Sequence, residues 1–253
     1  AGLDSRYLFI VDSMDPLRRV YDFLSPEYEE YIGVPLAYIP APNPDGTAST
    51  GSVSYAEYFL NPFLESLKEI GVFPEIEMNH EAYEDGRFSE KIDQAIGNRQ
   101  EIRDIIMTVS GRELPEDWFP YNPRGSNGSM DGVRVTGYEY PFVSWVDEDG
   151  TTGRADIRKA EGKMPWRIDW AARWIIHQVT CEPAGKDHGA AGGSFDTGIP
   201  ICEVLGGTPP EKIVYEWIQL KGMGPMSSSS GVTVGPMEAL SPVSYTHLRA
   251  HET

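Results

Sequence analysis

The sequence predicts an α/β protein with a doubly wound sheet. Three observations carry this prediction. The consecutive apolar run from Leu8 to Val11 turns polar at Asp12, as a fully buried strand does where it ends. Strand-like segments alternate along the chain with segments of helical period, which is typical of βαβ units. The 253 residues include 40% apolar and 24% charged residues, a composition typical of one or two globular domains.

The chain after residue 40 predicts a loop, a helix and a strand. Pro, Gly, Ser and Thr crowd residues 40–53, which indicates a loop. Ser54 and Glu57 stand three residues apart before an apolar pattern of helical period, so we expect a capping box there and a helix end at Gly71. The stretch PEIEMN, which begins at Pro74, alternates weakly and predicts a short strand.

A long helical pattern and then a β-rich segment follow. We expect Ser89 to cap the helical pattern, Gly97 to interrupt it and Gly111 to end it. Between Trp118 and Glu161 the helical period disappears, and the alternating segment VRVTGYEYPFVSWV precedes an acidic turn. This segment predicts a small β-rich insertion.

The last third of the chain returns to alternating helices and strands. A helix is expected from Asp169, with Trp170 and Trp174 packed in the core. The segment VTCEP predicts a strand, GIPICEVLGG follows a glycine-rich turn, and IVYEWIQL predicts another strand. Alternation places Tyr215 and Trp217 on one face of that strand, where core packing is the default expectation.

Charge restricts the partners of the chain. The sequence has 39 acidic and 21 basic residues, which gives a net charge of −18 and an isoelectric point near 4.6. A net negative charge of this size repels polyanions. Any nucleic acid must therefore bind to a local basic surface or to a further segment of the protein. An acidic surface that keeps the protein soluble is the simpler reading of the charge itself.

Cysteine content and hydropathy indicate a soluble protein of the cytoplasm. Cys181 and Cys202 are too few for a disulfide framework or a four-ligand zinc site, and we expect two buried, reduced thiols. No stretch reaches the roughly 18 consecutive apolar residues of a membrane helix. The first residues lack the basic and apolar regions of a signal peptide, and the absence of an initial Met indicates that the natural N-terminus lies upstream.

Two segments have the composition of ligand sites. In GKDHGAAGG, residues 185–193, glycines allow backbone N–H groups to approach a phosphate or carboxylate where a strand ends and a helix begins. The alternative is a purely structural turn in which His188 only satisfies hydrogen bonds. Trp166 follows Pro165 and is expected just before the helix, where its face can hold a ligand ammonium by a cation–π contact.

A third segment is rich in serine. KGMGPMSSSSGVTV, residues 221–234, has the composition of a flexible linker. Glycines bracket the serines, however, and the segment follows the last predicted strand. The competing interpretation is a loop whose hydroxyl groups donate hydrogen bonds to a triphosphate.

These segments, in this order, resemble class I lysyl-tRNA synthetases, the type found chiefly in archaea and some bacteria. The resemblance is carried by PWRIDWAARW, GKDHGAAGGSFDTG, YEWIQLKG and MSSSSG, and it extends upstream to SMDPLRRV and SYAEYFLNPFLESLKEIGVFPE. It covers about residues 5–240. It implies a Rossmann-like class I aminoacyl-tRNA synthetase catalytic domain with a small β-rich connective insertion.

The resemblance implies an activity and its partners. The enzyme would form lysyl-adenylate from lysine and ATP, with Mg²⁺ on the nucleotide, and then esterify tRNA(Lys). Trp166, Tyr215 and Asp187 would bind lysine, and His188, Ser227 and Ser229 would be catalytic. The residues that would contact ATP are Gly192, Gly193, Met226 and Ser228.

The resemblance also divides the chain. Residues 1–85 would be the first part of the Rossmann domain and 86–162 the connective insertion. Residues 163–240 would be the second half, with a KMSKS-like loop. Residues 241–253 continue no pattern before them and are expected to be a non-native tail.

Some features depart from the family pattern. No HIGH-type signature is found, and we expect that it was lost upstream. Pro225 and Ser230 stand where the loop usually has lysines, which predicts weak or no activity for this fragment. Residues 118–160 contain no cysteine, so no zinc or other metal site is predicted. Another class I aminoacyl-tRNA synthetase and a degenerate nucleotide-binding paralogue without catalysis remain as alternatives.

Overall fold

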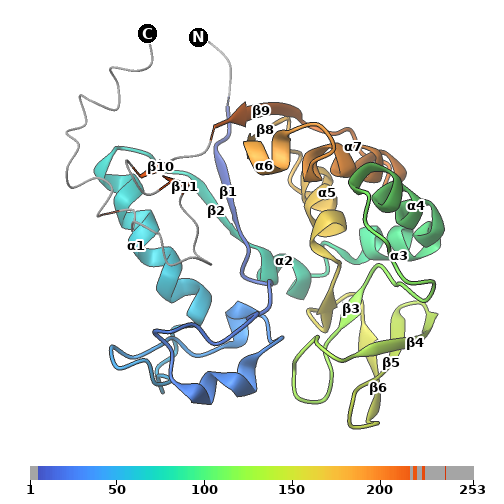
Figure 1. Cartoon of the computed structure of the whole chain (residues 1–253), viewed down its shortest axis with the longest axis horizontal. Helices are drawn as coiled ribbons and strands as arrows, with labels where there is room; N and C mark the ends of the chain where they lie inside the picture. The colour runs from blue at the N-terminus through green and yellow to red at the C-terminus, as the bar shows by residue number, and fades with distance from the viewer. Residues whose placement is uncertain (1–4, 217–218, 221–223, 226–236, 238–253) are drawn as a thin grey trace. The chain divides into compact units, whose positions relative to one another are not determined.

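The computed structural model describes residues 5–216, 219–220, 224–225 and 237. The described residues fall into two compact units, one containing residues 5–79 and the other residues 80–216. Each unit mixes helices with strands (Figure 1). The predicted mixed α/β class is therefore confirmed.

The first unit is built on a parallel pair of strands. β1 (Leu8–Val11) pairs with β2 (Glu75–Met78) in parallel, at the positions that the apolar run and the segment PEIEMN predicted. Between them along the chain lie the 3-10 helices η1 (Pro26–Tyr31) and η2 (Leu36–Tyr38), followed by α1 (Tyr55–Glu69). The connection between parallel strands thus contains a helix, as such a crossover requires.

The predicted capping box is present at the start of α1. The Glu57 N–H donates to the Ser54 hydroxyl at 3.2 Å, and the Ser54 N–H donates to the Glu57 carboxylate at 2.8 Å. These two bonds satisfy N–H groups that have no partner within the helix. At the other end, Gly71 has a φ of +75°, a left-handed conformation that glycine adopts without steric cost.

A small apolar core lies beneath these elements. Tyr28 is fully buried at its centre, and its hydroxyl donates to the Pro40 carbonyl at 2.9 Å. The bond removes the cost of burying the phenol group. The buried members of this core are Leu17, Leu24, Tyr28, Val34, Ile39 and Tyr55.

The second unit opens with helices. α2 (Asn79–Glu84) lies at its boundary, and α3 (Ser89–Gly97) and α4 (Arg99–Ser110) correspond to the predicted helical pattern with its break at Gly97. The prediction that Ser89 caps this pattern is wrong. Phe88 is the N-cap residue and Ser89 is the first helical residue, and the Ser89 hydroxyl donates to the Gly86 carbonyl at 2.7 Å instead of accepting from a helix N–H.

The predicted β-rich segment is a three-stranded antiparallel sheet. β4 (Arg134–Glu139), β5 (Phe142–Val146) and β6 (Thr152–Asp156) pair in that order, and β3 (Asn122–Pro123) pairs with β7 (Gly162–Lys163). Alternating burial along β5 agrees with the alternating sequence, since one face of an antiparallel sheet packs inward.

The second parallel pair lies near the end of the described chain. α5 (Trp166–Ile176) leads to β8 (Cys181–Gly185), which pairs in parallel with β9 (Glu211–Tyr215). The connection contains α6 (Lys186–Gly189) and α7 (Ser194–Val204). Among the described residues the parallel strands form two separate pairs, so the single doubly wound sheet stays a prediction. A further pair, Gln219–Leu220 with Gly224–Pro225, is antiparallel.

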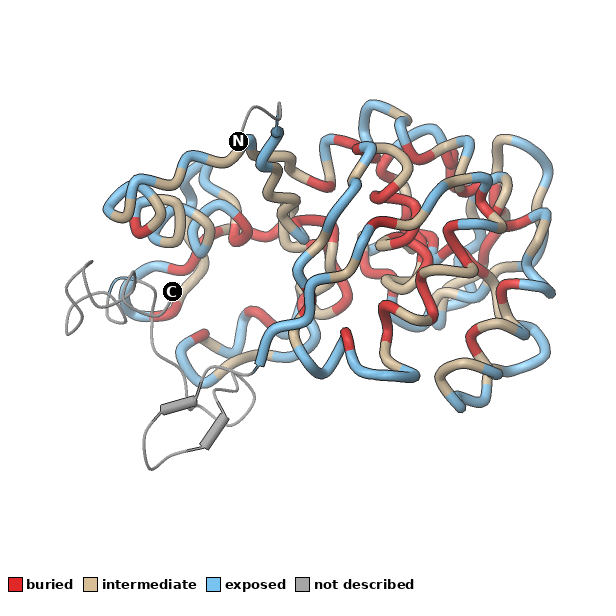
Figure 2. The backbone as a smooth tube through the Cα atoms, turned by 90° about the horizontal axis from the view of Figure 1, so that it is seen from above, coloured by how far each residue is buried: buried red, intermediate tan, exposed pale blue. Residues whose placement is uncertain are grey.

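The core of the second unit depends on the close packing of α5 against α7. The Trp174 and Phe195 rings are both buried, with centroids 4.8 Å apart. A Cβ atom at Gly198 would lie 2.6 Å from the Trp174 ring, so only glycine allows this approach of α7. α4 also packs against α7, and the buried stretches of the chain are red in Figure 2.

Three predictions about burial need correction. Trp174 is buried as expected, but Trp170 is only partly buried, because its indole N–H reaches outward to Glu182 Oε1 at 2.8 Å. Tyr215 is 52% exposed and does not belong to the core. Cys202 is buried, whereas Cys181 is exposed, since it begins β8 at the surface.

A buried ionic network fixes the beginning of α5. The Tyr83 hydroxyl donates to Asp169 Oδ1 at 2.6 Å and accepts from the Met164 N–H at 3.1 Å. Arg173 forms an ion pair with the same carboxylate, and Lys163 lies 3.9 Å from it. Burial is the main cause that raises the pKa of Tyr83. The network ties α2 and the residues just before α5 to the first turn of α5.

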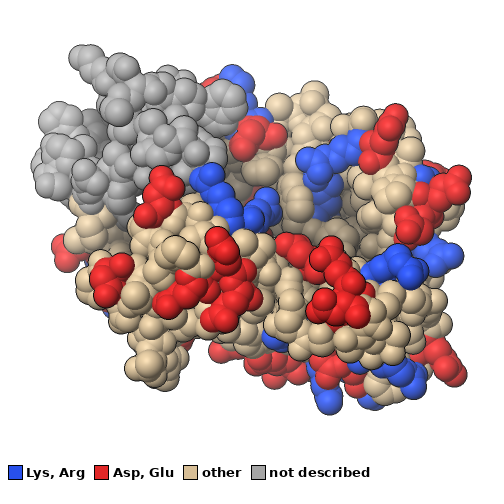
Figure 3. All heavy atoms as spheres, turned by 60° about the horizontal axis from the view of Figure 1, so that its bottom comes forward, with Lys and Arg blue, Asp and Glu red and all other residues tan. Residues whose placement is uncertain are grey.

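Charge is mixed on the surface that Figure 3 presents. Basic side chains lie there in small groups between acidic ones. Within the part of the chain that the structure describes, no helix has the length and apolar character needed to cross a membrane.

Loss of the capping box is expected to weaken the first unit. Ser54→Ala leaves the Glu57 N–H without its acceptor and should lower the free energy of unfolding by about 1 kcal/mol. Urea denaturation followed by circular dichroism measures the change. Ser52→Ala, at an exposed loop position two residues earlier, is the matched control and should have no effect. Equal stability of the two variants would contradict the role of the cap.

Removal of the Tyr83 hydroxyl is expected to cost more. In Tyr83→Phe the Asp169 carboxylate and the Met164 N–H both lose a buried partner, so the free energy of unfolding should fall by about 3 kcal/mol. Tyr138→Phe is the control, because it removes an exposed hydrogen bond to Asp93 and should cost less than about 1 kcal/mol. The same urea titration compares them, and similar losses in both would argue against a special role for the buried network.

Candidate functional site

The candidate site is organised around Trp166, the first residue of α5. The sequence pattern predicts Trp166 just before the helix, and the structure corrects this prediction. Pro165 precedes the helix, and its restricted φ suits a helix start. Because the helix includes Trp166, its ring lies one turn from Trp170, with the two centroids 6.0 Å apart and the planes 27° from parallel. The two indoles form an aromatic wall.

His188 lies against this wall. Its ring meets Trp166 and Trp170 edge to face, at centroid distances of 5.6 and 5.9 Å. Its Nδ1 atom is 3.3 Å from the Ser194 hydroxyl, and 47% of its side chain is exposed. The structure therefore brings together two of the predicted site residues, Trp166 and His188, and leaves the imidazole accessible to a ligand.

The carboxyl ends of β8 and β9 bring two more predicted residues to the same region of the second unit. Gly185 and Tyr215 are paired across the two strands, and a Cβ atom at Gly185 would lie 3.7 Å from the Tyr215 hydroxyl. Asp187 follows in α6, with its Oδ2 atom 3.6 Å from His188 Nε2. Both Asp187 and Tyr215 are exposed. The ends of parallel strands in α/β proteins are the usual place for ligands.

An ion pair clamps the glycine-rich turn between α6 and α7. Lys212 on β9 donates to Asp196 Oδ1 at 2.8 Å and to the Gly189 carbonyl at 2.9 Å. The Gly192 N–H donates to the other oxygen of Asp196 at 2.9 Å. The hydrogen bond from Lys212 is the main cause that lowers the pKa of Asp196. The turn is thus held by two side chains, Lys212 and Asp196, whose pairing no motif in the sequence indicates.

Gly193 lets the turn approach His188. It is the N-cap residue of α7, and a Cβ atom there would collide with the backbone carbonyl oxygen of His188. Only glycine allows the chain to pass so close to this carbonyl. Ser194, the first residue of α7, is thereby placed beside the His188 ring.

Arg167 is a further site residue that sequence reasoning missed. Its guanidinium carbon lies 4.5 Å from the centroid of the Trp166 ring, and its Nη2 atom lies 3.5 Å from the Ser194 hydroxyl. Burial, and then the positive charge of Arg112, lower the pKa of Arg167. Adjacent residues of a helix usually point in different directions, so the spacing of Trp166 and Arg167 does not predict this contact.

The serine-rich loop lies outside the described residues. This concerns the predicted site residues Met226, Ser227, Ser228 and Ser229, and also Trp217. Their predicted roles stay predictions.

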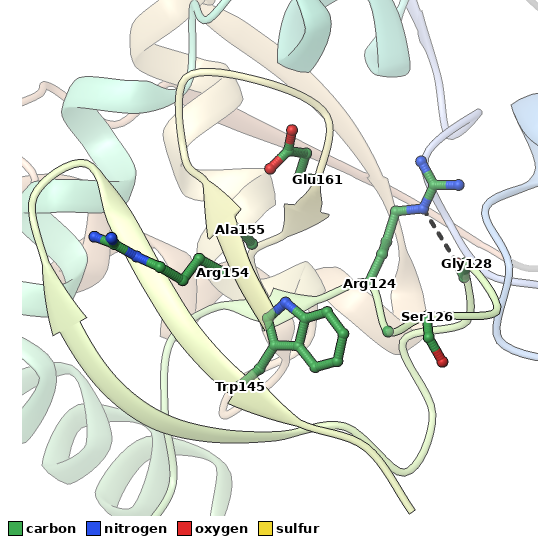
Figure 4. Close-up of a pocket in the computed structure, with 8 residues that line it drawn as sticks. Arg124, Ser126, Gly128, Trp145, Arg154, Ala155 and Glu161 are labelled. Carbon is green, nitrogen blue, oxygen red and sulfur yellow. Dashed lines mark hydrogen bonds between the residues drawn. The ribbon is translucent and has the colours of Figure 1, made fainter. Parts of the chain in front are cut away.

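A hollow in the β-rich segment does not coincide with this site. Its volume is about 450 Å³, and the two arginines that line it point in opposite directions from Trp145 (Figure 4). Arg124 donates to the Gly128 carbonyl at 3.1 Å, and Arg154 lies over the Phe142 ring at 4.3 Å. Both cations are thus engaged within the chain. The lining residues are Arg124, Gly125, Ser126, Gly128, Trp145, Arg154, Ala155 and Glu161.

The arrangement has the chemistry of a binding site for a small polar molecule. The indole wall offers π surface to a cation or a planar ring, and the imidazole offers a hydrogen bond. The glycine-rich turn and the first residues of α7 offer backbone N–H groups to an anion. Throughout the described residues, no group of three or more His, Cys, Asp or Glu side chains is placed to hold a metal ion.

Comparison with known proteins extends these observations. Residues 1–250 match the family described as tRNA synthetases class I (K). The chain is 45% identical over 241 residues to a lysine–tRNA ligase of Thermoplasma acidophilum, and 44% identical over 241 residues to one of Picrophilus torridus. In both cases the match covers 94% of this chain and 46% of the relative.

A relative from a third archaeal genus gives a match of similar identity and extent. The lysine–tRNA ligase of Archaeoglobus fulgidus is 44% identical over 236 residues, which cover 92% of this chain and 46% of the relative. The chain thus spans about half the length of the curated relatives it matches. On the extent of the family match, this chain belongs to the class I (K) tRNA synthetase family.

Proposed function

We propose that this chain is the lysine- and ATP-binding part of a lysine–tRNA ligase. The observation that supports the proposal is the contact of Trp166 with His188, which follows β8 closely along the chain, while Tyr215 ends the paired strand β9, in a chain so similar to lysine–tRNA ligases. The reaction would join lysine to ATP as lysyl-adenylate and then transfer lysine to tRNA(Lys). The enzyme would work in the cytoplasm.

A Rossmann-like catalytic domain is part of this proposal. Two parallel strand pairs with helices in their connections support it. In such domains, ligands bind where the carboxyl ends of parallel strands meet. The β-rich segment within residues 86–162 would be the connective insertion that divides the domain.

Lysine would lie between aromatic and polar groups. Its ammonium group would meet the indole wall and the exposed Tyr215 ring, where a cation–π contact contributes about 0.5–2 kcal/mol. Arg167 already lies over one face of Trp166, so the ammonium would use the remaining aromatic surface. The exposed carboxylate of Asp187 can balance the charge of the ligand.

ATP would lie along the glycine-rich turn. Gly192 and Gly193 leave room for the adenosine, and the clamp between Lys212 and Asp196 holds the turn in place before the nucleotide arrives. The lysine carboxylate would attack the α-phosphate, and pyrophosphate would leave. His188 can donate a hydrogen bond to an oxygen that gains charge in this step, and positioning of this kind replaces a covalent nucleophile.

Magnesium would enter with the nucleotide. Mg²⁺ at nucleotide sites usually keeps several waters and binds through phosphate oxygens, so these would be its main ligands. It would neutralise charge on the phosphates. The loop of Met226 to Ser229 would close over them, although Pro225 and Ser230 in place of lysines favour a slow enzyme or a nucleotide-binding paralogue.

Lysine binding tests the proposed specificity. Trp166→Ala and Tyr215→Ala should each weaken lysine binding about tenfold, because each removes aromatic surface from the ammonium. Isothermal titration with lysine, in the presence of ATP, measures the change. Tyr58→Ala, at an exposed aromatic position on α1, should bind lysine as the unaltered chain does. Binding of glutamate but not of lysine by the unaltered chain would refute the proposal.

A further inference from the structure

Arg167 has an unusual environment for a guanidinium group. Its Nε atom is buried and has no hydrogen-bond partner, and its contact with the Ser194 hydroxyl, at 3.5 Å, is long. The plane of Trp166 supports the group, which restricts where the guanidinium can point. The donors of Arg167 are therefore held beside Ser194 and His188 with most of their hydrogen-bonding capacity unused.

The charge of Arg167 is not balanced by a carboxylate. Within the ranges that the structure describes, no acidic side chain forms a salt bridge with it. Other sheltered cations of the second unit differ, since Arg173 pairs with Asp169 and Lys212 pairs with Asp196. After burial, the positive charge of Arg112 is the second cause that lowers the pKa of Arg167, so a second cation acts on this group in a chain of net charge −18.

Arg112 reaches this region from the end of α4. Gly111 ends that helix in a left-handed conformation, and Arg112 follows it directly. One turn earlier, the Val109 carbonyl oxygen lies 3.7 Å from the position a Cβ atom would take at Gly192. The end of α4 therefore adjoins the glycine-rich turn.

We propose that Arg167, with Arg112 beside it, binds a phosphate group of the adenine nucleotide at this site. The inference rests on the proposed function, which places ATP along the glycine-rich turn. A sheltered guanidinium with free donors and a neighbouring positive charge is suited to a phosphate oxyanion, which it can meet with two parallel hydrogen bonds. Arg167 is then a substrate-binding residue, and Trp166 has the second role of holding it.

The geometry favours a mononucleotide over the backbone of tRNA. Phosphates of a polynucleotide are met by exposed basic side chains, which stay hydrated until contact. Arg167 is only partly exposed and lies between an indole and the first residue of α7. A phosphate must enter the site to reach it, which a small ligand does most easily.

Nucleotide binding by the whole chain tests the inference. Isothermal titration with ATP and with adenosine should give about tenfold weaker ATP binding for Arg167→Gln, with adenosine binding unchanged, because only the phosphate contact is lost. Arg167→Lys keeps the charge but not the paired donors, so it should bind ATP with intermediate affinity. Arg112→Gln should give a smaller loss than Arg167→Gln.

Arg134→Gln is the matched control. It removes the same charge from an exposed position on β4 and should bind ATP as the unaltered chain does. Equal ATP affinity of Arg167→Gln and Arg134→Gln would overturn the inference, as would an equal loss for ATP and adenosine, which indicates a structural role. A loss confined to a tRNA acceptor-stem minihelix would assign Arg167 to nucleic acid and overturn it too. If the unaltered chain bound no ATP, the proposed function itself would fail, a result distinct from the others.

Discussion

The buried carboxylate of Asp169 is the constraint on which the site depends. A charge taken out of water is tolerated only with partners, and Tyr83 and Arg173 provide them. The Tyr83 hydroxyl also accepts a hydrogen bond from the Met164 N–H. One phenol group therefore connects α2, the segment before α5 and the first turn of α5. The place where α5 begins determines where Trp166 points.

The close packing of α7 against α5 positions the residues that form the surface of the site. Gly198 lets α7 approach α5 until Trp174 and Phe195 meet in the core. The same approach brings Ser194, at the start of α7, beside His188. Trp174, near the end of α5, thus stabilises the core of the unit, while Trp166, at the start of the same helix, stays available to a ligand. Stability and binding share a helix but use different turns of it.

Electrostatics divides the site into two parts. Lys212 forms an ion pair with Asp196 and holds the glycine-rich turn, so its positive charge is neutralised within the protein. Arg167 and Arg112 have no such acidic partner among the described residues, so their charge remains available to a ligand. A positive region inside an acidic protein attracts a small anion without making the whole surface attractive to polyanions.

The elements that local sequence predicts correctly are those whose stabilising contacts lie within a few residues. The strand at Leu8–Val11, the capping box of Ser54 and Glu57, and the helix break at Gly97 follow from side chains within a few residues of each other. The motif order was enough to indicate the family, and the family match confirms it. The tertiary structure decided the start of α5, the exposure of Tyr215 and the position of Arg167. All three features depend on contacts between residues far apart along the chain, such as Tyr83 with Asp169. A local sequence pattern cannot predict a contact of that kind.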